Sequence, residues 1–421
     1  MRTSRFWDGL KSRTMCKTTT PPRPAAQDAI RKLPANTTAA AVIALQSYLQ
    51  KYVNQFSNLL VPATRPSLPP DVDPNAYKRV AISVWPLRNK AVSPYYAGVF
   101  DDDTDFSASL VKAAALFAAG QLLADAKNEV SGATSAASFL ASLSAGLQAE
   151  INANADQRVV HAHFPSGSPV GLLPQTSSVL KVTGAGTSTA SVTFTDTFNA
   201  NLSLMIVQSD DPASAVCIDR LGYGYISAAL IEENFFDPAK GTGNGIWLAG
   251  DYANSNTYIR IPCVNDHPDA QLTTTRQMCR LFAMIRLKQL PEHDLDTNDL
   301  MQNLLKEPKP GGTVPWLSPT RVSVFPQFSF VLDKIGFAGL GAAQFPNVYS
   351  EGLVIKWNDT SQVDSFNNKI DPGATHPDIR LSGEIAICWQ NLLADNLHSG
   401  FDGIVEVLNE SISDFLDQKA L

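Results

Sequence analysis

Two histidines separated by one residue, His161 and His163, form a pair of side chains that could bind a metal ion. On an extended strand they would point to the same side, as two ligands of one Zn²⁺ ion must. The sequence indicates no third ligand near them. His267, His293 and His376 stand beside proline or acidic residues, as is typical of loops. We therefore predict a polar strand edge at 161–163 and no metal site.

Two glycine clusters and one acidic run could bind phosphate or a hard cation. Gly241–Gly245 has no helix opening after it, and the glycines of Gly336–Gly341 are in the wrong order for a dinucleotide-binding loop, so both are predicted to be turns or loops. Asp101–Asp105 lacks the spacing and the glycine of a calcium loop. It is predicted to cap a long helix, where acidic side chains oppose the helix dipole.

The remaining motif searches indicate no enzyme. The sequence has neither a P-loop nor the G-x-S-x-G pattern of a nucleophile elbow. No local context singles out a Cys/His nucleophile pair. We therefore predict no catalytic, cofactor-binding or metal-binding residue.

Charge is unevenly distributed along the chain. Met1–Leu33 contains eight basic and two acidic side chains, whereas the whole chain has a net charge of −7. A basic arm on an acidic body is typical of a segment that contacts a polyanion or a targeting receptor. We predict that six arm cations contact RNA: Arg2, Arg5, Lys11, Arg13, Lys17 and Arg23. The arm also has the composition of a mitochondrial transit peptide, so a soluble enzyme imported into an organelle stays open as an alternative.

Composition limits the class of protein. Charged residues make up 17% of the 421-residue chain, against about 25% in average soluble proteins. A low charge suits either a surface buried against other subunits or an ordinary polar surface. The five cysteines are widely spaced and odd in number, which argues against a disulfide framework. No run of 18 apolar residues occurs, so no transmembrane helix is expected.

Hydrophobic periodicity predicts an α+β chain. Apolar residues recur at helical spacing in six segments: 37–60, 106–127, 135–152, 272–290, 297–306 and 402–418. Short runs of β-branched and aromatic residues predict strands at 79–87, 191–195, 202–207, 223–226, 258–261, 321–332, 353–357 and 379–389. The region 161–262, which is rich in glycine, proline, serine and threonine, is therefore predicted to bear strands between helical flanks.

Taken together, the basic arm, the low charge, the Ala-rich helices and the lack of a catalytic motif resemble the capsid proteins of partitiviruses, small viruses with double-stranded RNA. The residues that carry the resemblance are Met1–Leu33 as the arm, 37–60 and 106–152 as helical layers, and 161–262 as a candidate protruding region. The resemblance implies a helix-rich shell-type domain and a structural protein, not an enzyme. It would self-assemble, through dimers, into an icosahedral shell around the genome.

The same resemblance divides the chain into four parts and names its partners. The division is a basic arm (1–36), a helical part of the shell domain (37–160), a strand-bearing, candidate protruding domain (161–265) and the helix-strand-helix remainder of the shell domain (266–421). The implied partners are further copies of the chain and viral RNA bound without sequence specificity, and no membrane. The implied locations are the virion and the host cytoplasm.

Overall fold

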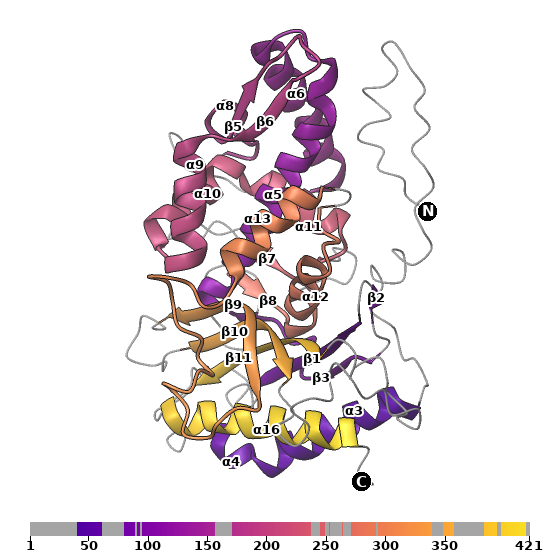
Figure 1. The fold of residues 1–421 in the computed structure, drawn as a ribbon, viewed down its shortest axis with the longest axis vertical. Coiled ribbons are helices and arrows are strands. Elements are labelled where there is room, and N and C mark those ends of the chain that lie inside the picture. Colours follow the sequence, from indigo (N-terminus) through magenta and orange to yellow (C-terminus); the bar gives the residue numbers. More distant parts are fainter. Residues whose placement is uncertain are drawn as a thin grey trace.

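The structure is a computed structural model of the 421-residue chain. It describes residues 40–60, 80–88, 91–92, 95–155, 171–236, 245–248, 252, 263, 271–291, 294–338, 348–357, 383–393 and 397–417. The described part is elongated, with an antiparallel sheet toward one end and a helical part toward the other (Figure 1).

The main sheet joins segments from both ends of the chain. Its strands are β1 (Ala81–Arg88), β2 (Ala91–Val92), β3 (Ala97–Val99), β9 (Phe328–Ala338), β10 (Val348–Trp357) and β11 (Glu384–Leu393). The order is β2-β1-β11-β10-β9, and β3 also pairs with β1. The pairing of β1 with β11 brings Ala81 opposite Gln390 and Leu87 opposite Glu384. Strand β9 therefore lies at one edge of the sheet.

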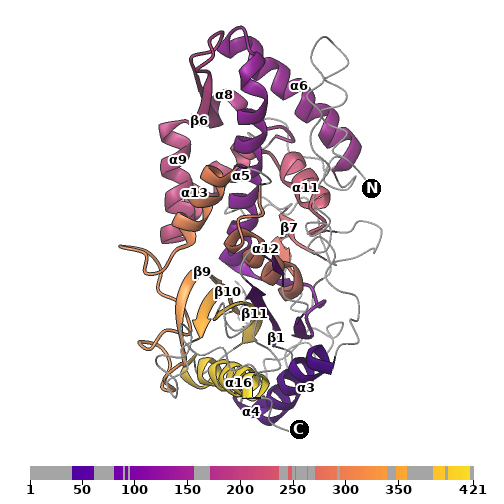
Figure 2. The same cartoon turned by 45° about the vertical axis from the view of Figure 1, so that its right-hand side comes forward.

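Helices from the two ends of the described chain cover one face of this sheet (Figures 1 and 2). They are α3 (Ala40–Gln55), the short α4 (Ser57–Leu60) and α16 (Leu397–Asp417). Leu45 and Leu49 of α3 are fully buried, as is Leu408 of α16, and they share one core with Trp389 of the sheet. The amphipathic pattern that predicted these two helices thus identifies the side that packs on the strands.

The opposite face of the sheet carries the helix at the centre of the helical part. A 3₁₀ turn, η2 (Ala108–Val111), leads directly into α5 (Lys112–Glu129). The helix Ala108–Glu129 is long and apolar enough to cross a membrane, but 83% of its most apolar window is buried inside the protein. The buried leucine and phenylalanine side chains of α5 and its many alanines let other helices pack closely around it. Helix α12 (Thr275–Arg286) packs on the sheet against β1, β10 and β11.

The rest of the helical part surrounds α5 (Figure 2). Its helical elements are η3 (Val130–Gly132), α6 (Ala136–Asn154), α8 (Thr176–Val179), α9 (Asp196–Ser203), the π-helical turn η4 (Leu204–Gln208), α10 (Asp211–Leu221), α11 (Tyr223–Glu232) and α13 (Leu295–Leu305). Two small sheets accompany them: β5 (Leu180–Thr183) with β6 (Ser191–Phe194), and β4 (Asp105–Phe106), β8 (Gln271–Thr273) and β7 (Trp247–Leu248) in that order.

The prediction of an α+β chain is confirmed, and several predicted strands are wrong. The segments 202–207 and 223–226 are helical, in α9, η4 and α11. In α11 eight successive residues, Tyr223–Leu230, are buried. A short apolar run of this kind has no period that separates a buried helix from a strand. The predicted strand 258–261 and the pair His161 and His163 lie outside the described residues.

The acidic run does not cap the long helix. Asp105 is in β4 and is buried, and α5 begins only at Lys112. Asp101 and Asp102 instead form ion pairs with Arg276 of α12, at 2.8 and 2.9 Å. The run therefore ties the turn before η2 to a neighbouring helix, a tertiary contact that local sequence does not indicate.

Candidate active site

A serine and a lysine stand one helical turn apart where the central helix begins. Ser109 lies in η2 and Lys112 is the first residue of α5, so the two side chains lie on the same side of the helix. Ser109 is partly exposed, whereas the Lys112 side chain is fully buried. Ala108, just before the serine, has a φ of +50°. A non-glycine residue in this region is strained, and such strain gathers at functional sites.

A second serine lies against the lysine. Ser209 follows η4 in the left-handed conformation, with a φ of +59°. The Lys112 Nζ donates to the Ser209 carbonyl oxygen at 2.6 Å and lies 3.3 Å from Ser209 Oγ. It also pairs with Asp211 Oδ1 at 2.7 Å. The intervening Asp210 accepts from the backbone N–H of Ala213 and caps α10, which fixes this turn.

A second buried lysine reaches the same hydroxyl from the sheet. Lys334 of β9 is fully buried, and its Nζ donates to Ser209 Oγ at 2.7 Å. Strand β9 comes this close to η2 because residue 336 is a glycine. A Cβ at Gly336 would overlap the carbonyl oxygen of Ser107 and lie only 2.9 Å from the backbone nitrogen of Leu110. Gly336, predicted to lie in a loop, is thus the residue at which the edge strand β9 packs on η2, the turn that carries Ser109.

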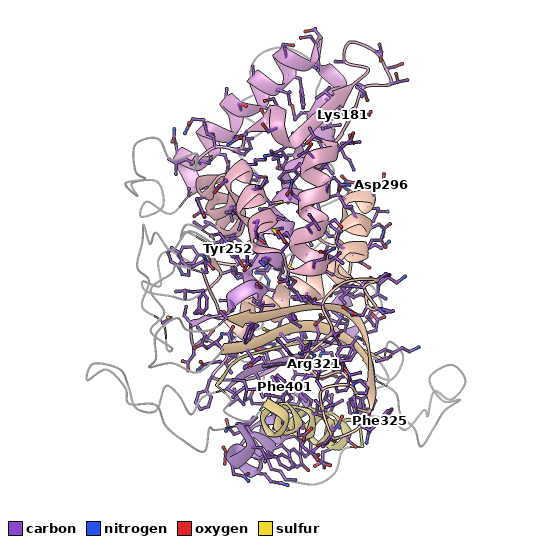
Figure 3. The ribbon with its side chains drawn as sticks, turned by 90° about the vertical axis from the view of Figure 1, so that its left-hand side faces the viewer. Lys181, Tyr252, Asp296, Arg321, Phe325 and Phe401 are labelled. Atoms are coloured by element: carbon purple, nitrogen blue, oxygen red, sulfur yellow. The ribbon has the colours of Figure 1, made fainter. Side chains whose placement is uncertain are left out.

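A tyrosine completes the group. The Tyr252 hydroxyl lies 3.4 Å from Ser109 Oγ and donates to Asp211 Oδ1 at 3.1 Å. Its ring lies 5.3 Å from Lys112 Nζ, and its backbone N–H donates to the Tyr223 hydroxyl at 3.1 Å. Figure 3 shows Tyr252 in the helical part, on the side that faces the sheet.

Burial changes the proton affinity of these groups. Burial lowers the pKa of Lys112, and the neighbouring Asp211 opposes that change. Burial also lowers the pKa of Lys334 well below its ordinary value, and the cations Lys112 and Lys309 lower it further. The pKa of Tyr252 is raised by burial and by Asp211, so its hydroxyl stays protonated and donates. A lysine with a lowered pKa can exist as the neutral amine that takes a proton from a serine hydroxyl.

Behind Lys334 lies a buried set of charged side chains. Lys309 Nζ contacts Glu307 at 2.5 Å and Asp333 at 3.1 Å.

A buried glutamate lies on the neighbouring strand. Glu351 of β10 accepts from the Trp316 backbone N–H at 2.8 Å and from Trp389 Nε1 at 3.1 Å. Burial and the neighbouring Asp333 raise the pKa of Glu351 well above its usual range. The Lys309–Asp333 ion pair and the hydrogen bonds accepted by Glu351 hold β9 and β10 in place under the site.

None of the residues predicted to contact RNA is among the described residues that form this group. The six arm cations predicted to contact RNA, and the side chains of all six histidines, lie outside the described part of the chain. RNA contact and self-association therefore stay predictions. Among the residues that the structure does describe, no three His, Cys, Asp or Glu side chains form a group that could hold a metal ion.

Comparisons with known proteins give structural likeness only. No protein-family model matches the chain. No curated protein matches it either. Among solved structures, the chain is similar to an extended-spectrum β-lactamase (10% identity, TM-score 0.47), covering 89% of this chain and 99% of that one. It is similar to a class A β-lactamase from Bacteroides cellulosilyticus (9%, TM-score 0.45, covering 88% and 99%) and to PBP-A (12%, TM-score 0.41, covering 87% and 97%).

These matches correct the prediction of a capsid. The solved structures found are β-lactamases and a penicillin-binding protein, not shell proteins, so the resemblance to a partitivirus capsid protein is wrong. The predicted virion and host-cytoplasm location is wrong with it. The prediction that the chain is not an enzyme is also contradicted. The physical reason for the error is that low charge and Ala-rich helices describe a large buried helical core as well as they describe a shell.

Three short motifs were missed in the sequence. Ser109-Leu-Val-Lys112, Ser209-Asp-Asp211 and Lys334-Ile-Gly336 are S-x-x-K, S-D-D and K-I-G. The S-x-x-K, S-D-N and K-T-G motifs carry the active site of class A β-lactamases and penicillin-binding proteins. The first of the three matches in full, and the other two each differ at one residue. The order of the three motifs along the chain and their wide separation, rather than any single motif, would have indicated the site.

Proposed function

We propose that the chain is a serine hydrolase or acyltransferase that forms a covalent acyl-enzyme on Ser109, of the mechanistic class to which β-lactamases and penicillin-binding proteins belong. The single observation that carries the proposal is the buried Lys112 amine. It lies one helical turn from Ser109, within 3.3 Å of Ser209 Oγ, and burial lowers its pKa. The substrate class that fits is an acyl compound with an attackable carbonyl, such as an amide.

In the first step, Lys112 as the neutral amine takes the Ser109 proton while Ser109 Oγ bonds to the substrate carbonyl carbon. The Ser209 hydroxyl lies between Lys112 and Lys334, at 3.3 and 2.7 Å. A proton can therefore pass from Lys112 through Ser209 to the leaving nitrogen as its bond to carbon breaks. Lys334 stabilises the oxygen of Ser209 during that transfer.

The second step returns the enzyme to its starting state. Water, or an acceptor amine in a transferase, attacks the ester on Ser109, and the Ser109 oxygen regains its proton. The strand beside the serine favours an extended substrate, because β9 is an edge strand with its outer side unpaired from Lys334 onward in the described sheet. An extended acyl chain can add to such an edge through main-chain hydrogen bonds.

The test is covalent labelling. The purified full-length chain is treated with a fluorophosphonate, which phosphonylates activated serines with loss of fluoride, and the adduct is located by peptide mass spectrometry. We expect one adduct on Ser109, lost in Ser109→Ala and slowed about 10²- to 10⁴-fold in Lys112→Met because the base is removed. A folded protein that takes no label at Ser109, or labels equally in Lys112→Met, would overturn the proposal. Benzylpenicillin in parallel tests whether a β-lactam carbonyl is also attacked.

A further inference from the structure

One carboxylate of the site faces outward beside the proposed nucleophile. The Asp211 side chain is 60% exposed, whereas its ion-pair partner Lys112 is fully buried. Both contacts of its carboxylate recorded in the described residues use Oδ1: Lys112 Nζ at 2.7 Å and the Tyr252 hydroxyl at 3.1 Å. Asp211 Oδ2 is therefore the oxygen that can accept a hydrogen bond from a substrate bound in the site.

The chemistry of this side chain restricts what it can bind. A carboxylate only accepts hydrogen bonds, whereas the amide that stands third in an S-D-N motif both donates and accepts. A substrate carbonyl placed against Asp211 would meet a second acceptor, while an N–H or an ammonium group would form a charge-assisted hydrogen bond. The aspartate therefore favours a substrate that presents a donor there.

The place of that donor on the substrate follows from Tyr252. Its hydroxyl is 3.4 Å from Ser109 Oγ and 3.1 Å from Asp211 Oδ1, so one phenolic oxygen is in reach of both. The carbonyl carbon that Ser109 attacks would therefore lie close to the Asp211 carboxylate, at a distance that a few covalent bonds of the substrate can span. An amino group on the carbon next to that carbonyl can reach the Asp211 carboxylate. An amine at the end of a long side chain would extend beyond it.

We propose that Asp211 selects substrates with a free amino group on the carbon next to the attacked carbonyl, that is, aminoacyl amides or esters, including peptides with a free N-terminus. This inference rests on the acyl-enzyme function proposed above. In the reaction, the Ser109 Oγ–carbon bond forms and the carbon–nitrogen or carbon–oxygen bond of the leaving group breaks. The leaving group takes the proton that Ser109 gave up, and water then releases the free amino acid. The ammonium group keeps its protons and stays against Asp211.

The experiment compares matched substrates. Alanyl p-nitroanilide and N-acetylalanyl p-nitroanilide, each as the D and the L form, differ only in whether the amine is free. With the full-length chain we expect kcat/KM to be about 10- to 100-fold higher for the free amine of the reactive stereoisomer, the range of one charge-assisted hydrogen bond. Asp211→Asn should remove that preference, so that the ratio of kcat/KM for the free-amine substrate to kcat/KM for the acetylated one falls to about 1.

A competing role for Asp211, as a counter-ion of Lys112 alone, predicts a different result. In that case Asp211→Asn changes both substrates by the same factor, and the inference is refuted. Asp196→Asn is the matched control, because Asp196 also opens a helix as an exposed first-turn acid but lies in α9. It should change neither rate.

Fluorophosphonate labelling separates the two proposals. If Ser109 labels in the wild type and in Asp211→Asn but the acetylated substrate reacts as well as the free amine, the aminoacyl inference fails and the acyl-enzyme function stands. If Ser109 does not label in the wild type, both fail. Thermal melting of each variant confirms that a lost rate belongs to a folded protein.

Discussion

Replacing Gly336 with alanine should disable the site by moving its parts apart. The added methyl group would overlap the Ser107 carbonyl oxygen and the Ser350 hydroxyl, and it would lie 2.9 Å from the Leu110 nitrogen. Carbon atoms normally keep about 3.5 Å from such neighbours. Strand β9 and the turn η2 must therefore separate by roughly 1 Å. Overpacking of this kind costs about 1 to 3 kcal/mol of folding free energy.

The same displacement should slow the chemistry as well as lower the stability. Lys334 is carried on β9 and Ser109 on η2, so a separation of roughly 1 Å misaligns the nucleophile and lowers the rate about 10²-fold. The assay is the rate of fluorophosphonate labelling of Ser109, measured beside the free energy of unfolding in urea. The Ser350 hydroxyl, which donates to Ser107 O at 2.6 Å, would also lose its geometry.

Gly311→Ala is the matched control. Gly311 has a φ of +70°, and a Cβ atom added there would have no heavy atom within 4 Å. Alanine there should cost about 1 to 2 kcal/mol of backbone strain and leave the labelling rate unchanged. If Gly336→Ala labels Ser109 as fast as the wild type does, the close packing of β9 on η2 does not position the site and the reasoning is refuted.

Three further predictions concern protons in and under the site. Burial lowers the pKa of Lys112, and Asp211 partly opposes that change, so the rate of Ser109 labelling should rise with pH with a midpoint below the ordinary lysine value of 10.5. Asp211→Asn should shift that midpoint to lower pH, and an unchanged midpoint would contradict the reasoning. Ser209→Ala should slow release of p-nitroaniline from the anilide substrate about 10²-fold or more with little change in melting temperature, because the proton path to the leaving nitrogen is lost; an unchanged rate would remove Ser209 from the mechanism. Glu351, with its raised pKa, binds a proton in the folded state that the unfolded state releases above about 4.5, so stability should fall as pH rises above that value. Glu351→Gln, which mimics the protonated acid, should flatten this dependence in urea unfolding, while Glu351→Ala should cost about 2 to 4 kcal/mol by leaving its partners unpaired.

The sequence predicted the elements with strong periodicity. The predicted segments overlap the helices α3, α5, α6, α12, α13 and α16 and the strands β1, β6, β10 and β11, although several of their ends differ. The strand predicted at 321–332 begins too early, because β9 spans Phe328–Ala338. The segments 202–207 and 223–226 were predicted to be strands but are helical. In α11 eight successive residues are buried, so the local pattern there has no period and only tertiary packing decides the conformation.

The candidate site, like the fold, was only partly predictable from the sequence. The sequence by itself determines which chemical groups each part carries: a serine and a lysine three residues apart, an S-D-D segment, and a lysine followed two residues later by a glycine. It did not bring them together, because Ser109, Ser209 and Lys334 lie far apart along the chain. Only the tertiary structure decided that one hydroxyl, Ser209 Oγ, meets both lysines, since the sheet and the central helix must first pack face to face. Only that packing excludes water from Lys112 and lowers its pKa, which is a property of burial and not of any sequence motif.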